Sequence, residues 1–208
     1  MDIGAHKAGY TYWMARQLGR TGMVYAFEPQ SHLYDYITRI RDVCRWDNVK
    51  VENIALSDET TTATLRIPHG KPGKKSSPGA TIIEGDRQFT GSTQKVGTES
   101  LDSYCSRHAI APDFLKIDVE GNELKIFRGG INTLKTSKPR ILVEIESRHA
   151  GKERAIETFD FLKSLGYSGH FIKGSERIPL ASFSFETHQN LQDMKNYCNN
   201  FTFEHSRD

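Results

Sequence analysis

The chain has 208 residues, a length that fits one domain and allows a sizeable buried core. Its 28 basic and 26 acidic side chains leave a net charge of +2, and this balance does not indicate a nucleic acid or a membrane as partner. The three cysteines, Cys44, Cys105 and Cys198, are widely spaced, which argues against a disulfide framework and against a cysteine zinc site. No apolar run approaches the roughly 20 residues that span a bilayer, and no secretory signal is visible, so we expect a cytoplasmic protein.

The first predicted strand lies at the very start of the chain. Met1, Asp2 and Ile3 have a strand pattern, and Gly4 begins a glycine turn directly after them. A strand usually has about 5–6 residues, so this one is expected to be truncated at its N-terminal end.

Segments with buried-strand patterns alternate with segments of helical period along the rest of the chain. This alternation is typical of an α/β fold with a mostly parallel sheet and helices on both faces. The predicted strands are Met23–Phe27, Val49–Ala55, Phe114–Val119, Arg140–Ile145, Tyr167–Ile172 and, as an antiparallel edge strand, Asn200–Phe203. The apolar stripes of the predicted helices are Leu33-Ile37-Ile40-Cys44, Leu124-Phe127-Ile131-Leu134 and Ile156-Phe159-Leu162-Leu165. The pair Gly129-Gly130 weakens the prediction of one continuous helix at the second stripe.

Residues 68–95 interrupt this alternation with a stretch rich in glycine, proline, serine and lysine. Long irregular segments inside a compact domain are uncommon and are usually functional. We predict an irregular hairpin or lid over the ligand face, within a single domain that covers residues 1–208. Lys71, Lys74 and Lys75 in this segment would attract an anionic acceptor, although a run of charge is more often a solvated face.

Unusual residues follow the carboxyl ends of five predicted strands. In an open parallel sheet, ligands bind beyond these ends, so the five loops are expected to converge on one rim. The segments are Gly4–Gly9, Glu28-Pro29, Ala55–Asp58, Asp118–Gly121 and Glu144–Glu146.

The first loop and Glu28 indicate a nucleoside ligand. Gly4 and Gly9 allow a tight strand-to-helix turn, and Glu28 follows Gly9 by 19 residues, the distance expected for a carboxylate that accepts ribose hydroxyls. A dinucleotide needs glycine at the middle position of such a loop, where this chain has His6. S-adenosylmethionine has no phosphate, and its amino-acid end can meet an acid such as Asp2, so the loop favours this cofactor over NAD.

The third strand ends in apolar residues that suit an adenine ring. Ile54 and Ala55 would supply apolar walls and backbone hydrogen bonds, with Ser57 or Asp58 nearby. The alternative is that these residues only finish a strand and begin a turn.

Acidic residues at two neighbouring strand ends are candidates for catalysis. Asp118 and Glu120 lie on one side of their strand, and Glu144 and Glu146 repeat this spacing on the next. A carboxylate at the end of a buried strand is costly without a partner or ligand, and Lys116, Arg140 and Arg148 are possible ion-pair partners. His149 is a further candidate proton acceptor, because its ordinary pKa lies near neutrality. We interpret Asp118, Glu120, Glu144 and His149 as candidate catalytic residues.

Several motifs together resemble the FkbM family of methyltransferases. They are DIGAHKAGYTY, VYAFEPQSHLYDYI, NIALSD, ESLDSYC, PDFLKIDVEGNELKIFRGG, PRILVEIE and the terminal NNFTF. The resemblance implies a Rossmann-like class I methyltransferase fold with a seven-stranded sheet, S-adenosylmethionine as cofactor and O-methylation as activity. It also implies that Asp2, Gly4 and Ala5 line the methionine end, Glu28 the ribose, Ile54 and Ala55 the adenine, and Asp118 the reacting end. His6 stands where the family usually has asparagine.

The resulting hypothesis is a methyltransferase that modifies a hydroxyl group of a small molecule or sugar. His6, Gly9, Pro29 and Ser57 complete the predicted cofactor-binding set, and no metal site is predicted. Two alternatives remain: a nicotinamide-dependent oxidoreductase of the same fold, and a non-catalytic methyltransferase-like module. The sequence does not identify the acceptor or the oligomeric state.

Overall fold

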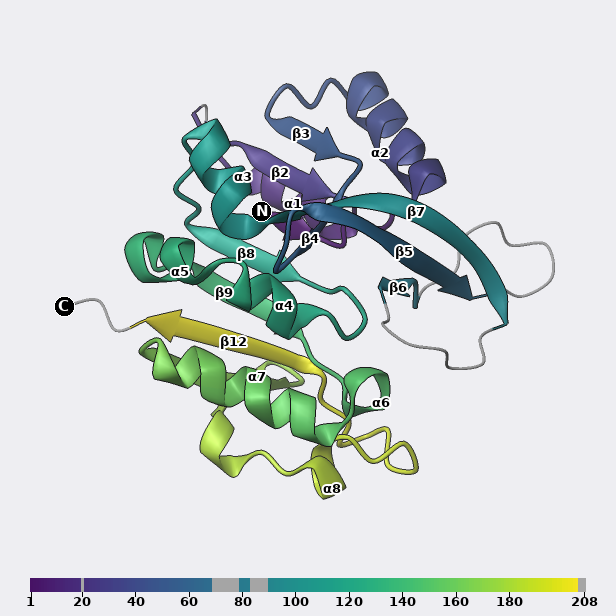
Figure 1. The fold of residues 1–208 in the computed structure, drawn as a ribbon. Coiled ribbons are helices and arrows are strands. Elements are labelled where there is room, and N and C mark those ends of the chain that lie inside the picture. The colour runs from purple at the N-terminus through teal and green to yellow at the C-terminus, as the bar shows by residue number, and fades with distance from the viewer. Residues whose placement is uncertain (20, 69–78, 83–89, 206–208) are drawn as a thin grey trace.

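The computed structural model describes residues 1–19, 21–68, 79–82 and 90–205. The larger of two sheets contains strands β1 (Asp2–Ile3), β2 (Val24–Phe27), β3 (Val49–Glu52), β8 (Phe114–Ile117), β9 (Arg140–Glu144), β10 (Tyr167–Lys173), β11 (Glu176–Pro179) and β12 (Asn200–His205). Their order across the sheet is β11-β10-β12-β9-β8-β1-β2-β3 (Figure 1). The short strand β1 therefore lies inside the sheet, parallel to both β2 and β8.

Five neighbouring strands, β3, β2, β1, β8 and β9, are parallel, as predicted. The sheet has an antiparallel edge strand, as predicted, but the assignment of Asn200–Phe203 to that edge is wrong, because β12 pairs with β9 on one side and β10 on the other. The edge is formed instead by β11, which a tight turn at Gly174 (φ +61°) folds back onto β10. This hairpin raises the sheet to eight strands, one more than predicted.

Helices pack on both faces of the larger sheet. They are α1 (Gly9–Gln17), α2 (Ser31–Cys44), α3 (Leu101–His108), α4 (Glu123–Arg128), α5 (Ile131–Ser137), α6 (Ser147–Ala150), α7 (Lys152–Ser164) and α8 (Phe185–His188), with a short 3-10 turn at Leu180–Ser182. No helix in the described ranges has the length and apolar character required to cross a membrane.

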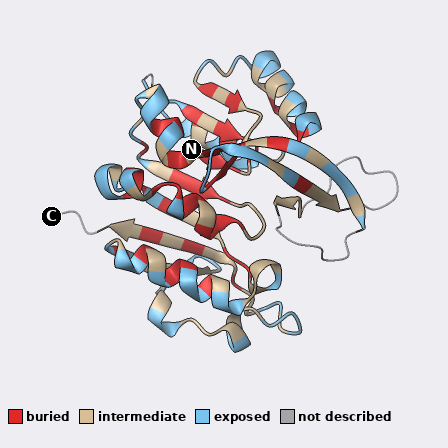
Figure 2. Cartoon of the chain, in the orientation of Figure 1, coloured by how far each residue is buried: buried red, intermediate tan, exposed pale blue. Residues whose placement is uncertain are grey.

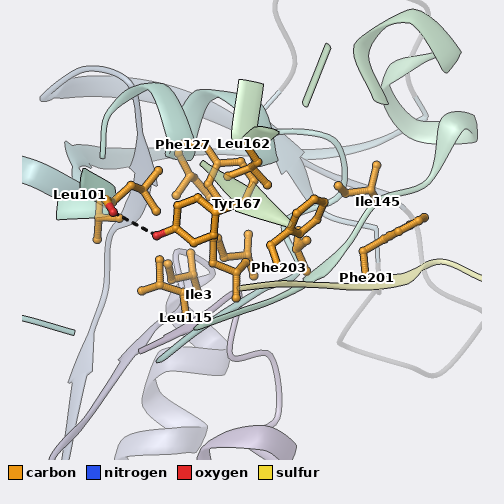
Figure 3. Close-up of a cluster of buried hydrophobic side chains, with 14 of the residues drawn as sticks. Ile3, Leu101, Leu115, Phe127, Ile145, Leu162, Tyr167, Phe201 and Phe203 are labelled. Carbon is orange, nitrogen blue, oxygen red and sulfur yellow. Dashed lines mark hydrogen bonds between the residues drawn. The ribbon is translucent and has the colours of Figure 1, made fainter. Parts of the chain in front are cut away.

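The alternation of side chains along β2 separates two apolar clusters. Val24 and Ala26 belong to the smaller cluster, which α1 and α2 cover, and Phe27 belongs to the larger cluster beneath α3, α4, α5 and α7. The central strands are accordingly buried on both faces (Figure 2). In the larger cluster, the Tyr167 hydroxyl donates a hydrogen bond to the Leu134 carbonyl at 3.1 Å, which satisfies a polar group inside an apolar core (Figure 3).

A second, four-stranded sheet lies beside the carboxyl end of β2 and carries part of the predicted insertion. It contains β4 (Ala55–Ser57), β5 (Thr61–Pro68), β6 (Thr81–Ile82) and β7 (Gly91–Ser100), in the order β4-β7-β5-β6. The predicted strand Val49–Ala55 is thus divided between two sheets. The described parts of segment 68–95 contain strand β6 and the start of strand β7, so they are not wholly irregular. Lys71, Lys74 and Lys75 lie outside the described residues.

The helix predicted over Leu124–Leu134 is divided into α4 and α5 at Gly129 and Gly130. A Cβ atom on Gly129 would lie 2.1 Å from the Ser57 carbonyl oxygen, closer than any side chain tolerates. The glycine is therefore required because the end of α4 packs directly against the backbone of β4.

Candidate active site

The loop after β1 is held against the ends of both neighbouring strands. The amide groups of Gly4 and Ala5 each donate to the Phe27 carbonyl oxygen at 3.0 Å. On the other side, a Cβ atom on Gly4 would lie 1.9 Å from the Asp118 carbonyl oxygen, and the φ angle of Gly4 is +82°. Only glycine satisfies both conditions, so Gly4 brings the loops after β1, β2 and β8 together.

These loops enclose a cavity at the carboxyl ends of the strands, as the sequence predicted. Its apolar wall is formed by Phe27, Ile54, Ala55, Leu56, Leu65 and Ile82. Its polar residues include His6, Glu28, Gln30, Asp118, Glu120 and Asn122. An apolar cleft with a few convergent polar groups is the usual form of a small-molecule site.

Glu28 is the most deeply buried acid of the cavity, with 3% of its surface exposed. Its Oε2 atom accepts the His6 amide N–H at 2.8 Å, and its Oε1 atom accepts the Gln30 amide N–H at 2.9 Å. Burial raises the pKa of this carboxyl group to about 7, although the two backbone hydrogen bonds act in the opposite direction. A carboxylate has about four lone-pair sites, so two remain for a ligand.

Other polar groups at the same cavity have unused hydrogen-bonding capacity. Within the described part of the chain, the buried atoms His6 Nε2 and Gln30 Oε1 have no hydrogen-bond partner. Burial lowers the pKa of His6, with a smaller contribution from Lys7. His6 has a φ angle of +49°, an uncommon conformation for a residue with a side chain. Because buried polar groups are nearly always paired, this cavity fits a ligand with several polar atoms.

Residues 79–82, from the second sheet, lie over the cavity and are fastened to the loop after β8. The Thr81 hydroxyl donates to the Glu120 carbonyl at 2.8 Å, and the Asn122 side chain donates to the Ile82 carbonyl at 2.7 Å. Ala80 and Ile82, which fall within segment 68–95, line the cavity and therefore form part of its wall.

A buried lysine lies between two acids behind the cavity. Lys116 Nζ is 3.7 Å from Asp2 Oδ1 and 3.4 Å from Asp118 Oδ2, and 7% of its side chain is exposed. Asp2 is fully buried, and its Oδ2 atom accepts a hydrogen bond from the Thr11 hydroxyl at 2.5 Å. Lys116 thus compensates the charge of Asp2 and also contacts Asp118, which lines the cavity.

A second ionic cluster begins at Glu120 and extends away from the cavity. Glu120 Oε2 lies 2.8 Å from His149 Nδ1, and His149 Nε2 lies 3.7 Å from Glu146 Oε2. Burial opposes ionisation of Glu120, but its hydrogen bond and ionic contact with His149 hold the pKa of Glu120 below its ordinary value. Glu146 also pairs with Arg148.

Glu144 stands beside this cluster and has a different electrostatic environment. Its Oε1 atom accepts from the Asn199 side chain at 2.8 Å, and the same amide group donates to Glu146 at 2.7 Å. Burial, reinforced by the charges of Asp118 and Glu120, raises the pKa of Glu144 to about 7. A carboxyl group that titrates near neutrality is suited to proton transfer.

The structure brings most of the predicted site residues to one cavity. Its lining includes Gly4, His6, Glu28, Pro29, Ile54, Ala55, Asp118 and Glu120. Six other predicted residues are absent from the described lining. Asp2, Ala5, Gly9 and Ser57 belong to the strands, the loop and the helix start around the cavity, and Glu144 and His149 belong to the adjoining ionic cluster. Within the described ranges, no group of three or more His, Cys, Asp or Glu side chains is arranged to hold a metal ion.

Sequence reasoning missed several residues of the cavity lining, among them Gln30, Leu65, Ile82 and Asn122. Gln30 follows the predicted acid by two residues, and its proximity to Glu28 was the only available signal. Leu65, Ile82 and Asn122 gave no signal, because the first two come from the second sheet and the third is recruited by a contact to that sheet.

Comparison with protein families gives one match, which covers most of the chain. The model of the methyltransferase FkbM domain matches residues 2–168. Curated proteins, in contrast, give no match to this chain.

Solved structures with a similar fold are methyltransferases of low sequence identity. Methyltransferase FkbM from Methylobacillus flagellatus KT is 16% identical with a TM-score of 0.56, and the match covers 97% of this chain and 42% of that protein. A putative rRNA methylase from Clostridium thermocellum is 10% identical, also at a TM-score of 0.56, over 100% of this chain and 87% of the other. An O-methyltransferase from Bacillus cereus, solved in complex with SAH, is 17% identical at a TM-score of 0.50, over 97% and 70%. The chain thus spans less than half of the Methylobacillus protein, and these similarities concern the fold.

Proposed function

The chain belongs to the FkbM methyltransferase family, and from this premise we propose that it is an S-adenosylmethionine-dependent O-methyltransferase acting on a hydroxyl group of a small molecule or sugar. Family membership favours this function over the nicotinamide-dependent alternative. The observation that carries the proposal is the cavity at the strand ends, where Glu28, His6 and Gln30 offer polar atoms between apolar walls.

The cavity residues fit an adenosyl group with a charged amino-acid end. Glu28 would bind the ribose, Ile54 and Ala55 would contact the adenine, and Pro29 would close the wall between them. Gly4 and His6 would line the methionine end, with Asp118 beside the reacting centre. Asp2, Ala5, Gly9 and Ser57 act indirectly in this proposal, since they hold the loops that carry the contacts.

S-adenosylmethionine, held by Glu28, His6 and the apolar wall, would supply an electrophilic methyl group, and transfer of this group to the acceptor oxygen would break its bond to the sulfonium sulfur and leave S-adenosylhomocysteine. The contribution of the chain is to orient that oxygen and to receive its proton, a step for which a positioned base adds roughly 10²–10⁴-fold. Glu144 and His149 are the candidate bases, because they lie next to the cavity lining without being enclosed by it. Asp118 would orient the acceptor hydroxyl from the cavity edge.

Glu120 and Lys116 are positioning residues in this mechanism. Glu120 contacts His149 Nδ1 and would thereby orient the imidazole, whose Nε2 lies 3.7 Å from Glu146 Oε2 and would exchange the proton. Lys116 contacts Asp118 Oδ2 and would hold this carboxylate in place. The acidic character of this cluster favours a neutral polyhydroxylated acceptor over an anionic one.

The proposal is tested by turnover with methyl-labelled S-adenosylmethionine against a panel of sugars and hydroxylated metabolites. We expect label transfer to an oxygen of at least one neutral acceptor, and its loss in Asp118→Asn. A control variant, Glu186→Gln, changes an exposed ion pair with Lys152 and should retain turnover. Binding of S-adenosylhomocysteine without transfer to any acceptor would instead favour a non-catalytic module.

A further inference from the structure

Gln30 lies at the N-terminal end of α2, but its side chain does not cap that helix. It occupies the N-cap position, where polar side chains usually accept a hydrogen bond from the first turn, yet its side chain makes no capping hydrogen bond. Its backbone carbonyl alone accepts from the Leu33 and Tyr34 amides, both at 2.9 Å. A role in helix capping therefore does not explain this side chain.

The side chain of Gln30 is turned into the cavity and incompletely satisfied. Only 4% of the residue is exposed, it lines the cavity, and its Oε1 atom has no hydrogen-bond partner among the described residues. A buried acceptor without a donor is unfavourable, and native structures contain few of them. Such a group is expected where a ligand provides the missing donor.

The position of Gln30 relative to Glu28 indicates which donor this is. The Gln30 backbone N–H donates to Glu28 Oε1 at 2.9 Å, and both residues line the cavity. The Gln30 Oε1 atom, which has no donor among the described residues, is therefore available to a ligand beside the Glu28 carboxylate. Two acceptors, one charged and one neutral, stand side by side.

A ribose presents two neighbouring hydroxyl donors to such a pair. Both oxygens of Glu28 already accept a backbone N–H, from His6 and from Gln30, so half of its lone-pair sites are used. We propose that Gln30 determines specificity for the ribose: its Oε1 atom accepts one hydroxyl of the adenosyl group, and the Glu28 carboxylate accepts the other. This inference rests on the proposed function, since it names a further contact at the same site.

The experiment compares S-adenosylhomocysteine with its 2′-deoxy and 3′-deoxy analogues by titration calorimetry. For the wild-type protein, each missing hydroxyl should weaken binding by about tenfold, the effect of one hydrogen bond. Gln30→Met keeps the length of the side chain and removes the acceptor. It should bind S-adenosylhomocysteine about tenfold more weakly and no longer discriminate against one of the two deoxy analogues.

A matched control is Gln94 on β7, which contacts the chain on both sides of Gln30. Gln94 donates to the Pro29 carbonyl at 3.0 Å and to the Ser31 hydroxyl at 2.9 Å, and the described cavity lining does not include it. Gln94→Met should therefore keep the full discrimination. Thermal unfolding without ligand separates binding from folding, because Gln30→Met removes an unsatisfied acceptor and should unfold at an unchanged or higher temperature.

One result overturns the inference, and a second overturns its premise. Full discrimination against both analogues in Gln30→Met would exclude the proposed contact. If this variant also unfolds at a lower temperature than the wild type, the side chain has a structural role instead. A folded wild-type protein that does not bind S-adenosylhomocysteine would refute the proposed function itself, an outcome distinguishable from the first.

Discussion

His149 Nδ1 lies 2.8 Å from Glu120 Oε2, and this contact joins the loop after β8 to α6. The two residues come from different strand-end loops, 29 positions apart, and Glu120 is held in a left-handed conformation with a φ angle of +58°. This conformation is unusual for a residue with a side chain. Gly121, with a φ angle of +103°, follows directly and permits the sharp turn that brings Glu120 towards His149.

Substitutions of this pair should act as a unit. We expect His149→Gln to lower kcat by about 10²-fold, the loss typical for a proton-transfer group, and Glu120→Gln to lower it by about tenfold through a misplaced imidazole. The double variant should be no slower than His149→Gln alone, because the role of Glu120 is exercised through His149. Steady-state kinetics at saturating cofactor give the measurement. Fully additive losses would show that the two side chains act independently.

Cofactor affinity should depend on pH through Glu28. The pKa of this carboxyl group is about 7, and its ionised form accepts stronger hydrogen bonds from hydroxyl groups than its protonated form. The affinity for S-adenosylhomocysteine should therefore rise as the pH increases from about 6 to about 8. Titration calorimetry across this range tests the sign, and Glu28→Gln should bind more weakly with little change over the same interval. An affinity that falls with rising pH in the wild type would contradict the assignment.

Glu123 should make the free energy of unfolding depend on pH. Burial raises its pKa in the folded state to about 7 from an ordinary value of 4.5, so the folded protein binds more protons than the unfolded chain between these values. The contribution of Glu123 to stability is therefore full below about pH 4.5 and is lost as the pH rises through 7. Glu123→Gln keeps an oxygen to accept the Gly121 N–H at 2.8 Å and removes this titration. Denaturation curves should show a gain in stability at pH 8 of up to about 3 kcal/mol, and no gain at pH 4.

Removal of Lys116 should expose the cost of the buried charge on Asp2. Asp2 is fully buried, and its contact with the Lys116 ammonium group spans 3.7 Å. Lys116→Met should destabilise the fold by about 3 kcal/mol, because it leaves a buried carboxylate without its compensating charge. Adding Asp2→Asn removes that charge and keeps an acceptor for the Thr11 hydroxyl, so the double variant should recover much of the loss in urea denaturation. If the double variant is no more stable than Lys116→Met, the charge of Asp2 is not the cause.

Gly4 and Gly9 provide a matched pair at the two ends of one loop. Gly4→Ala would place a Cβ atom 1.9 Å from the Asp118 carbonyl oxygen at a φ angle of +82°, so this variant should be destabilised by well over about 1 kcal/mol. Gly9→Ala, at the start of α1, meets no heavy atom of the described residues within 4 Å and should be as stable as the wild type or more so. Thermal unfolding of both variants checks the difference. Equal stability would show that the close approach of the two loops is relaxed in solution.

The parallel strands of the larger sheet, and the place of most predicted site residues at one cavity, could be predicted from local pattern. Glu28 and Asp118 follow buried strands directly, and parallel strands end at one edge, so their convergence on one cavity follows from the fold class. The position of β12 could not be predicted in the same way. The sequence pattern predicts a strand at Asn200–Phe203 but contains no information about the two neighbours with which it pairs.

The sequence by itself determined the α/β fold class, the family and the strand ends at which the site lies, because these depend on periodicity and on motifs of adjacent residues. Only the tertiary structure decided which polar groups are left for a ligand. In the sequence Gln30 is notable only because it follows Glu28 by two residues, and its unused acceptor becomes apparent only when the partners within the described residues are known. Whether a buried polar atom is satisfied depends on segments distant in the chain, and no local pattern records them.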